Sequence, residues 1–244
     1  MKFKTLAFLL LITQLSLYSQ VRQNGLIIPK DFNTEFSCCV YAPKNGFSVY
    51  NKPNGNRIGT LSTKTKYKTK SEFDENLFFI DDQLKKDLVI DLKTLVEVGY
   101  EMLSLTFFER KNGFVRIVDK SAEYWLKEEE ITDTHFKILD WQQFYFDMKH
   151  QLLGFYADEK GLDLKTAPSL NSKTIKTLKG DLFEITPTDK TKGNWTKVNV
   201  KKYKKHPCVA DFEEKENVEY EVEGWIEVID TKGKPTLWFY SRGC

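Results

Sequence analysis

The sequence lacks a strong net charge. Its 37 lysine and arginine residues are nearly balanced by 35 aspartate and glutamate residues, which leaves a formal net charge of +2. A protein that attracts nucleic acid through its electrostatic field carries a concentrated basic face. The basic run at residues 201–206 is followed closely by acidic residues in 213–223, so we interpret it as the solvated rim of a hairpin. We therefore expect no nucleic-acid partner.

The sequence also lacks an apolar run long enough to cross a membrane as a helix. The apolar stretch at residues 6–12 follows Lys2 and Lys4 and precedes a polar stretch that ends near Ser19. It is too short for a membrane span, and its basic flank lies on the side that export requires. This pattern predicts a signal peptide over residues 1–19. The mature protein is then periplasmic or secreted and has no transmembrane segment.

Motifs for catalysis and cofactor binding are absent as well. There is no glycine-rich phosphate loop and no dinucleotide fingerprint, so we expect no cofactor. A Cys-His peptidase needs a nucleophilic cysteine beside a held histidine in a domain of its own, whereas His135 and His150 are typical of surface or capping residues. The acidic groups at 81–82 and 128–130 are sequence neighbours with no second acid placed across a groove. We expect a protein without catalytic residues.

Cysteine is scarce, with four residues at Cys38, Cys39, Cys208 and Cys244. An even number in an exported chain is usually oxidised. Three pairings of the four cysteines are possible. Adjacent cysteines on a strand point to opposite faces, and a bond between Cys38 and Cys39 would distort the peptide. We expect a disulfide between Cys208 and Cys244. A zinc site could instead join His206 and Cys208 to the adjacent pair, but a second short-spaced ligand pair is missing. We expect no metal.

The most informative stretch is residues 161–180. It contains an alternating strand, a turn at 167–169, a second strand and a final Gly180. Its apolar positions are Leu162, Leu164, Ile175 and Leu178. With Lys165 after the first strand and a Pro-Ser turn, this stretch resembles the opening of a bacterial Src-homology-3 (SH3) domain. The resemblance implies a small β-barrel that binds a peptide, a glycan or a protein segment.

A weaker copy of the same pattern lies upstream, so the chain contains an internal repeat. Its first turn is two residues shorter, a change that turns accommodate readily. The matched segments are 47–50 with 162–165, 52–55 with 167–169, 112–118 with 193–200, and 124–128 with 224–228.

The sequence therefore predicts a mostly β chain with two small SH3-like β-barrels joined by a short amphipathic α-helix. The expected parts are a first barrel over 20–131 with an insertion at about 66–108, a connecting helix within 132–153, a second barrel over 154–231 with an insertion at about 203–223, and an aromatic tail over 232–244. For the first insertion we expect extra strands or a long loop with a helical piece near 79–88. The tail is too aromatic to stay in solvent and should lie along a barrel.

The connecting helix has a clear apolar face. Asp140 can cap its start, and apolar residues recur with helical spacing at Trp141, Phe144, Tyr145, Met148 and Leu152. A membrane-surface or partner-binding role is the alternative, but two barrels need an element that fixes their relative position. We expect the helix to pack in a core or between the barrels.

Strand alternation places a candidate ligand surface on both barrels. In the second copy Val198 and Val200 should face the core, so Trp195 and Lys197 should point outward. Phe114 and Arg116 should do the same in the first copy. A ring beside a cation suits stacking on a sugar or peptide while pairing with a carboxylate. The alternative is that the insertions or the helix cover these rings as a second small core.

We therefore expect a non-catalytic, exported binding module that recognises cell-wall peptide or glycan, or a segment of an envelope protein. The alternative is a structural or assembly protein of an envelope complex with no small-molecule ligand. A hydrolase of unrecognised type is a third hypothesis. Fold by itself does not decide among them.

Overall fold

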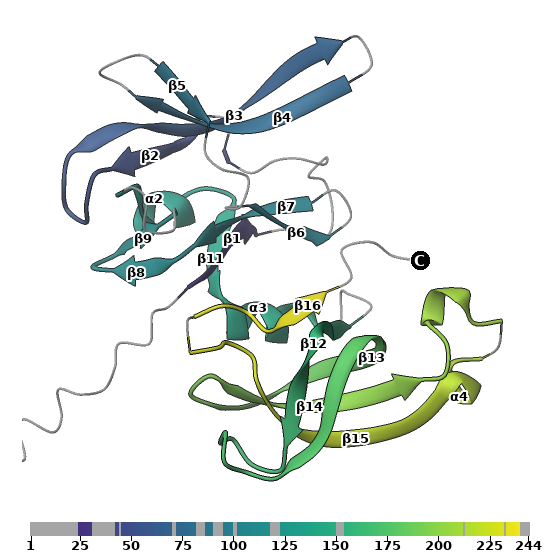
Figure 1. Cartoon of the computed structure of the whole chain (residues 1–244). Helices are drawn as coiled ribbons and strands as arrows, with labels where there is room; N and C mark the ends of the chain where they lie inside the picture. The colour runs from purple at the N-terminus through teal and green to yellow at the C-terminus, as the bar shows by residue number, and fades with distance from the viewer. Residues whose placement is uncertain are drawn as a thin grey trace, which may run out of the picture.

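The computed structural model describes residues 24–30, 42–43, 45–69, 72–81, 86–89, 95–99, 102–117, 123–149, 154–211, 213–231 and 233–239. The predicted signal peptide, Cys38, Cys39, His150 and Cys244 lie outside these residues. The chain is mostly β, as predicted, and its strands form three sheets (Figure 1). Within the described residues, no helix has the length and apolar character needed to span a membrane.

The first sheet has four antiparallel strands in the order β11, β1, β7, β6. Their bounds are Phe136–Asp140 for β11, Gly25–Pro29 for β1, Met102–Phe107 for β7 and Leu95–Gly99 for β6. Strand β1 lies near the start of the segment assigned to the first barrel, and it pairs on both sides, with Gly25 opposite Asp140 on β11 and opposite Phe107 on β7.

All five residues of β1 are buried, because this strand separates two hydrophobic cores. Leu26 and Ile28 belong to a core shared with helix α3 (Trp141–Met148) and the third sheet. Ile27 belongs to the other core, with residues of the second sheet. Successive side chains of a strand point to opposite faces, so one short apolar strand contributes to both cores.

The second sheet contains seven strands in the order β5, β4, β3, β2, β10, β9, β8. Their bounds are Lys86–Val89, Glu72–Asp81, Arg57–Thr69, Phe47–Tyr50, Trp125–Lys127, Phe114–Arg116 and Glu109–Lys111. The short helix α2 (Glu128–Thr132) follows β10. The described residues of the insertion lie mainly in strands. The helical piece expected near 79–88 is wrong for these residues, because β4 ends at Asp81 and β5 begins at Lys86.

The third sheet closes on itself, with the strand order β13, β14, β15, β12, β16 and an additional pairing between β13 and β12. Its strands are β12 (Phe155–Lys165), β13 (Thr174–Lys192), β14 (Trp195–Tyr203), β15 (Val218–Glu227) and β16 (Leu237–Phe239). The ring is completed where Lys165 pairs with Trp225. Its interior is filled by fully buried apolar side chains, namely Leu164, Leu178, Ile185, Val198, Val200 and Ile226.

The second and third sheets pair equivalent positions of the two copies in the same way. Phe47 opposes Leu61 as Leu162 opposes Leu178. The other equivalent pairs are Tyr50–Trp125 with Lys165–Trp225, Arg116–Trp125 with Lys197–Trp225, and Lys111–Phe114 with Lys192–Trp195. The positions matched by sequence are therefore also matched in strand pairing. Among the described residues the second sheet stays open, with β5 and β8 at its edges.

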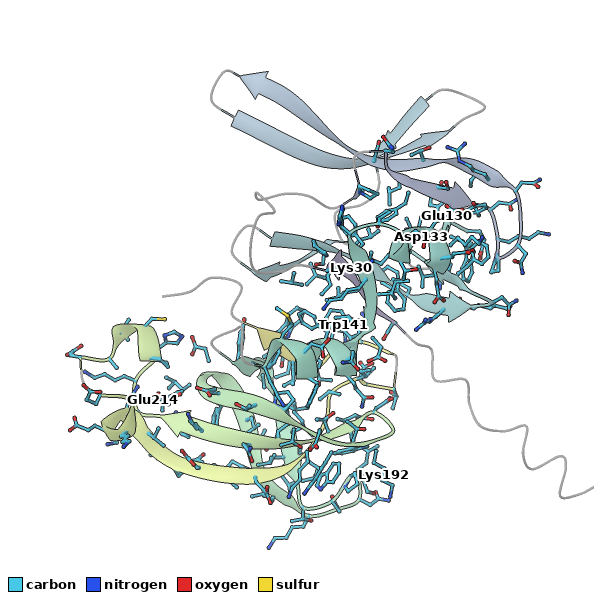
Figure 2. All side chains as sticks on the ribbon, turned by 180° about the vertical axis from the view of Figure 1, so that it is seen from behind. Lys30, Glu130, Asp133, Trp141, Lys192 and Glu214 are labelled. Atoms are coloured by element: carbon cyan, nitrogen blue, oxygen red, sulfur yellow. The ribbon has the colours of Figure 1, made fainter. Side chains whose placement is uncertain are left out.

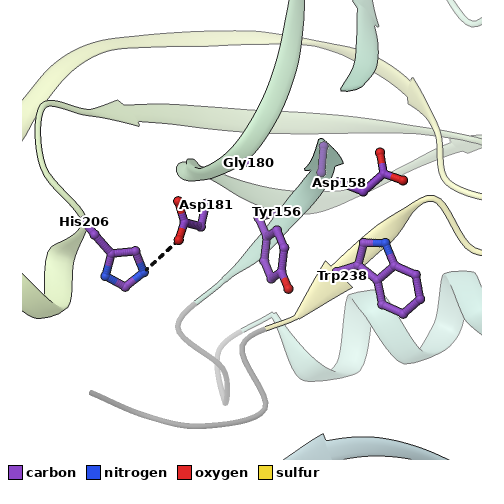
Figure 3. A pocket seen from close by; sticks show the side chains of 7 residues that line it. Tyr156, Asp158, Gly180, Asp181, His206 and Trp238 are labelled. Carbon is purple, nitrogen blue, oxygen red and sulfur yellow. Dashed lines mark ion pairs between the residues drawn. The ribbon is translucent and has the colours of Figure 1, made fainter. Parts of the chain in front are cut away.

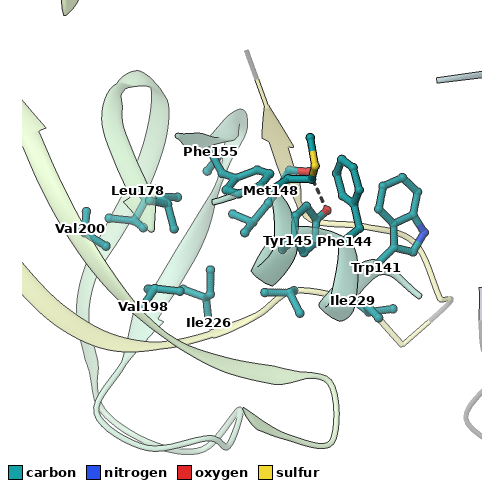
Figure 4. Close-up of a cluster of buried hydrophobic side chains, with 14 of the residues drawn as sticks. Trp141, Phe144, Tyr145, Met148, Phe155, Leu178, Val198, Val200, Ile226 and Ile229 are labelled. Atoms are coloured by element: carbon teal, nitrogen blue, oxygen red, sulfur yellow. Dashed lines mark hydrogen bonds between the residues drawn. The ribbon is translucent and has the colours of Figure 1, made fainter. Parts of the chain in front are cut away.

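Helix α3 packs between the first and third sheets, as its apolar face predicts (Figures 1 and 4). The Asp140 side chain accepts a hydrogen bond of 2.8 Å from the Gln143 backbone N–H, which confirms the cap. The buried residues of the helix are Trp141, Phe144, Tyr145 and Met148, and Trp141 lies toward the first sheet (Figure 2). Leu152 lies outside the described residues. The helix therefore joins the first sheet and the closed sheet in one core.

Tyr145 is the polar member of this core. Its hydroxyl donates a hydrogen bond of 2.9 Å to the backbone carbonyl oxygen of Leu237 on β16. Its ring lies edge-on to Phe155, with centroids 4.9 Å apart. Burial raises the pKa of Tyr145 well above its ordinary value of 10.0, since the charged form has no water around it.

We expect Gly25→Ala to prevent normal pairing of β1. An added Cβ would lie 2.0 Å from the Leu139 carbonyl oxygen and 2.7 Å from the Asp140 Cα, and backbone atoms cannot move aside without breaking the register. The expected loss in the free energy of unfolding is about 3 kcal/mol or more in urea titration. Gly193→Ala is the control, because it has a positive φ of 57° but no atom within 4 Å, and should cost about 1 kcal/mol. Equal losses in the two variants would contradict this account.

Tyr145 should also make the protein sensitive to alkali. Its folded-state pKa lies above the unfolded value, so its contribution to stability is complete below about pH 10 and falls as the pH rises further. Tyr145→Phe should cost about 1 kcal/mol at pH 7, through loss of the hydrogen bond to Leu237. The difference between variant and wild type should shrink above pH 10 in urea titrations. Parallel pH profiles would show that Tyr145 does not titrate with unfolding.

Candidate functional site

The predicted surface of the second copy follows strand alternation. Thr196, Val198 and Val200 are buried, while Trp195 and Lys197 are half-buried on the opposite face of β14. The Lys197 ammonium forms an ion pair with the Glu223 carboxylate across the β14–β15 pair, and this contact lowers the pKa of Glu223. Lys197 therefore already has an anionic partner, which a ligand carboxylate would have to displace.

In the first copy the predicted outward exposure of Phe114 and Arg116 is wrong. Both are buried, with exposed fractions of 4% and 5%. The Phe114 ring packs edge-on against Tyr50, with centroids 5.4 Å apart, and Arg116 Nε lies 3.3 Å from a carboxylate oxygen of Glu109. The Tyr50 hydroxyl in turn donates to Glu130 of helix α2. Phe114 is therefore covered, as in the alternative of a second small core, but by Tyr50 of β2 and not by the insertion or the connecting helix.

Cys208 lies on the 3-10 helix η3 (Pro207–Val209). The nearby His206 Nδ1 accepts a hydrogen bond of 3.2 Å from the Cys208 backbone N–H, so the imidazole caps this turn. No group of three or more metal-ligating side chains occurs among the described residues. The other three cysteines lie outside those residues, so the disulfide between Cys208 and Cys244 stays a prediction.

Mass spectrometry of peptides from non-reduced protein should recover Cys208 linked to Cys244. If that bond closes the loop, its reduction should lower the free energy of unfolding by about 3 kcal/mol, because the unfolded chain gains freedom. A Cys208→Ser, Cys244→Ser double variant serves as the control, since reductant should not alter its stability. Four free thiols in freshly exported protein would refute the prediction.

The structure contains a groove that sequence reasoning did not locate (Figure 3). Its volume is about 510 Å³, within the range of small-ligand sites. The groove lies at one end of the closed sheet, where β12, β16, the bend of β13 and the loop after β14 meet. It is lined by Tyr156, Ala157, Asp158, Gly180, Asp181, His206 and Trp238.

Two aromatic residues form the apolar part of the groove. Tyr156 on β12 and Trp238 on β16 are directly opposite in the antiparallel register, and opposite residues project their side chains from the same face. Trp238 is 43% exposed, whereas its neighbour Leu237 is buried and receives the Tyr145 hydroxyl. Alternation in Leu237–Phe239 thus directs one residue into the core and the next into the groove.

Two carboxylates and a histidine complete the lining. Asp158 Oδ1 accepts the backbone N–H groups of Lys160 and Gly161 at 3.0 and 3.2 Å. Gly180 has a positive φ of 71°, and the chain turns there before Asp181. Asp181 Oδ2 lies 3.9 Å from Nε2 of His206.

The loop that carries His206 is held by a buried asparagine. Asn217, which ends helix α4 (Glu214–Asn217), is 2% exposed. Its side chain accepts from the Lys205 backbone N–H at 3.0 Å and donates to the Lys205 carbonyl oxygen at 2.8 Å. Its own carbonyl oxygen accepts from the Lys204 N–H at 2.9 Å. These three hydrogen bonds fix Lys204 and Lys205, directly before His206, and so set one wall of the groove.

The sequence did carry part of the signal for the groove. Phe155-Tyr156-Ala157 and Leu237-Trp238-Phe239 are short aromatic segments, and the second belongs to the tail that is expected to lie along a barrel. Their mutual pairing joins positions about 80 residues apart, which local patterns do not reveal. No family model, no curated protein and no solved structure matches this chain.

Proposed function

We propose that the protein is a non-catalytic, exported binding protein of SH3-like construction. Its ligand is a cell-wall peptide or glycan, held in the groove between Tyr156 and Trp238. Support for the SH3-like part comes from the closed ring of β12, β13, β14 and β15, whose opening strands contain the motif at residues 161–180. The matching register of the second sheet supports a second unit of the same origin, modified by its insertion.

The observation that carries the binding role is the exposed Trp238 ring in a preformed groove. A large aromatic side chain seldom stays in solvent without a reason, and here it is paired with Tyr156 beside two carboxylates. Rings supply stacking area at low entropic cost, and carboxylates fix the orientation of a ligand. This groove replaces Trp195 and Lys197 as the favoured site, because Lys197 is engaged by Glu223.

A structural or assembly role in an envelope complex is the second candidate. It is favoured by two exposed apolar side chains outside the aromatic pair, Leu170 at 62% and Val209 at 64%. Val209 lies on η3, near the groove, so a protein partner could cover Val209 and the groove together. The two candidates differ in whether isolated cell-wall material is sufficient for binding.

Purified sacculi should retain the wild-type protein, and Trp238→Ala should reduce retention by about fivefold or more, as expected when a central aromatic contact worth about 1 kcal/mol is lost. Phe146→Ala is a matched control, since Phe146 is an exposed ring (37%) on helix α3 and does not line the groove. Retention is measured by sedimentation, with circular dichroism to show that each variant is folded.

Other outcomes separate the alternatives. If Trp195→Ala lowers retention on sacculi and Trp238→Ala does not, the ligand site lies on the strand surface predicted from the sequence. Failure of sacculi to retain the protein, together with recovery of a protein partner, would favour the assembly role. Release of cleaved muropeptides would support the hypothesis that the protein is a hydrolase.

A further inference from the structure

The groove presents two aromatic rings from one face of the sheet. Tyr156 on β12 and Trp238 on β16 are opposite each other in the antiparallel register, so their side chains project on the same side (Figure 3). Trp238 is 43% exposed, while Leu237, one residue earlier, is buried. A ligand that lies on these rings gains contact area at low entropic cost, because both rings stand on paired strands.

Asp158 adds a hydrogen-bond acceptor beside the rings. It lies on β12 as Tyr156 does, and Figure 3 shows Asp158 and Trp238 on the same side of the Tyr156 ring. Its Oδ1 atom accepts the backbone N–H groups of Lys160 and Gly161, which fixes the orientation of the carboxylate, and no described residue donates to its Oδ2 atom. A carboxylate oxygen accepts and does not donate, so the ligand atom placed there carries an O–H or an N–H.

The indole of Trp238 adds a hydrogen-bond donor. Its Nε1–H has no acceptor among the described residues, and an indole nitrogen donates but does not accept. A matching ligand therefore offers both donors and acceptors around an apolar face. Hydroxyl groups meet both needs, because each one donates one hydrogen bond and has lone pairs that accept others.

An extended peptide fits this arrangement less well than a sugar ring. A peptide that adds a strand to a sheet needs a free edge, whereas the Leu237 carbonyl oxygen of edge strand β16 already accepts from Tyr145. A pyranose ring with equatorial substituents instead has apolar faces of axial C–H bonds and hydroxyl groups around its rim. Its face can lie on an aromatic ring while its rim reaches the polar atoms beside that ring.

Within the proposed binding function, we propose that the groove binds a neutral saccharide whose ring substituents are equatorial. One face of the sugar ring lies on Tyr156 and Trp238, and hydroxyl groups at its rim donate to Asp158 Oδ2 and accept from Trp238 Nε1. This inference rests on the proposed function, because it names the ligand class of the same groove. It selects the glycan over the peptide.

The first test separates the glycan of the wall from its peptides. Sacculi are digested with an amidase that removes the stem peptides, and sedimentation measures retention of the full mature chain on the remaining glycan strands. We expect these strands to retain the protein as well as intact sacculi do. Chitotriose, a neutral saccharide with equatorial substituents, should release the protein, whereas the freed stem peptides should not.

The second test concerns ring geometry and uses isothermal titration calorimetry. Cellotriose and β-1,4-linked mannotriose differ only at the 2-hydroxyl group, which is equatorial in the first and axial in the second. An axial hydroxyl interrupts the apolar face, so cellotriose should bind about fivefold more tightly. Salt should leave its affinity unchanged, because no ion pair forms between the sugar and the groove.

Variants locate the polar contacts. Asp158→Asn keeps an oxygen for the backbone N–H groups of Lys160 and Gly161 but turns an amide donor toward the ligand, and Trp238→Phe keeps a ring but removes the indole N–H. Each should weaken cellotriose by roughly threefold to tenfold, the range expected for one lost hydrogen bond. Asp189→Asn is the matched control, because Asp189 is exposed on β13 and does not line the groove, and it should leave the affinity unchanged.

The failures are distinguishable. Release by stem peptides but not by chitotriose would overturn the saccharide proposal and leave the binding function intact, provided that intact sacculi still retain the protein through Trp238. Equal affinities for cellotriose and mannotriose, or an equal loss in Asp189→Asn and Asp158→Asn, would also overturn the proposal. Absence of retention on intact sacculi would remove both the inference and the proposed function.

Discussion

Strand β1 is the constraint on which the rest of the molecule depends. It pairs with β11 and β7, and its alternating side chains enter two different cores. The two halves of the chain therefore do not complete their cores independently, because Leu26 and Ile28 serve one and Ile27 serves the other. Helix α3 strengthens this connection by burying its rings in the core that β1 shares with the closed sheet. A strand near the start of the described chain thus contributes to both cores.

Much of the β structure could be predicted from the sequence, because it is encoded in local patterns. Alternation at 162–165 and 195–200, the turn residues and the cap at Asp140 each determine a neighbouring element directly. The central place of β1 could not be predicted, since its short apolar run has no alternation and its two partners lie about 80 and 110 residues away. The groove escaped prediction for the same reason, because it arises from the long-range pairing of β12 with β16.

The two copies share a register but differ in what covers their outer rings. In the first copy Phe114 packs against Tyr50, and α2 holds that tyrosine through Glu130. In the second copy the position equivalent to Tyr50 is Lys165, whose ammonium bonds to Thr174 and Asp163. Trp195 consequently lacks the tyrosine that covers its counterpart. The presence of a lysine at 165, where the first copy has Tyr50, explains why Phe114 is buried and Trp195 is half-exposed. The sequence showed both residues, but the contact between strands became visible only in the fold.

The hydrogen bond from the Asn24 side-chain amide to the Gly233 carbonyl oxygen links positions 209 residues apart. It joins the start of the described chain to the turn that precedes β16. A variant or truncation that displaces Asn24 would therefore also remove a contact of the turn before β16, the strand that carries Trp238.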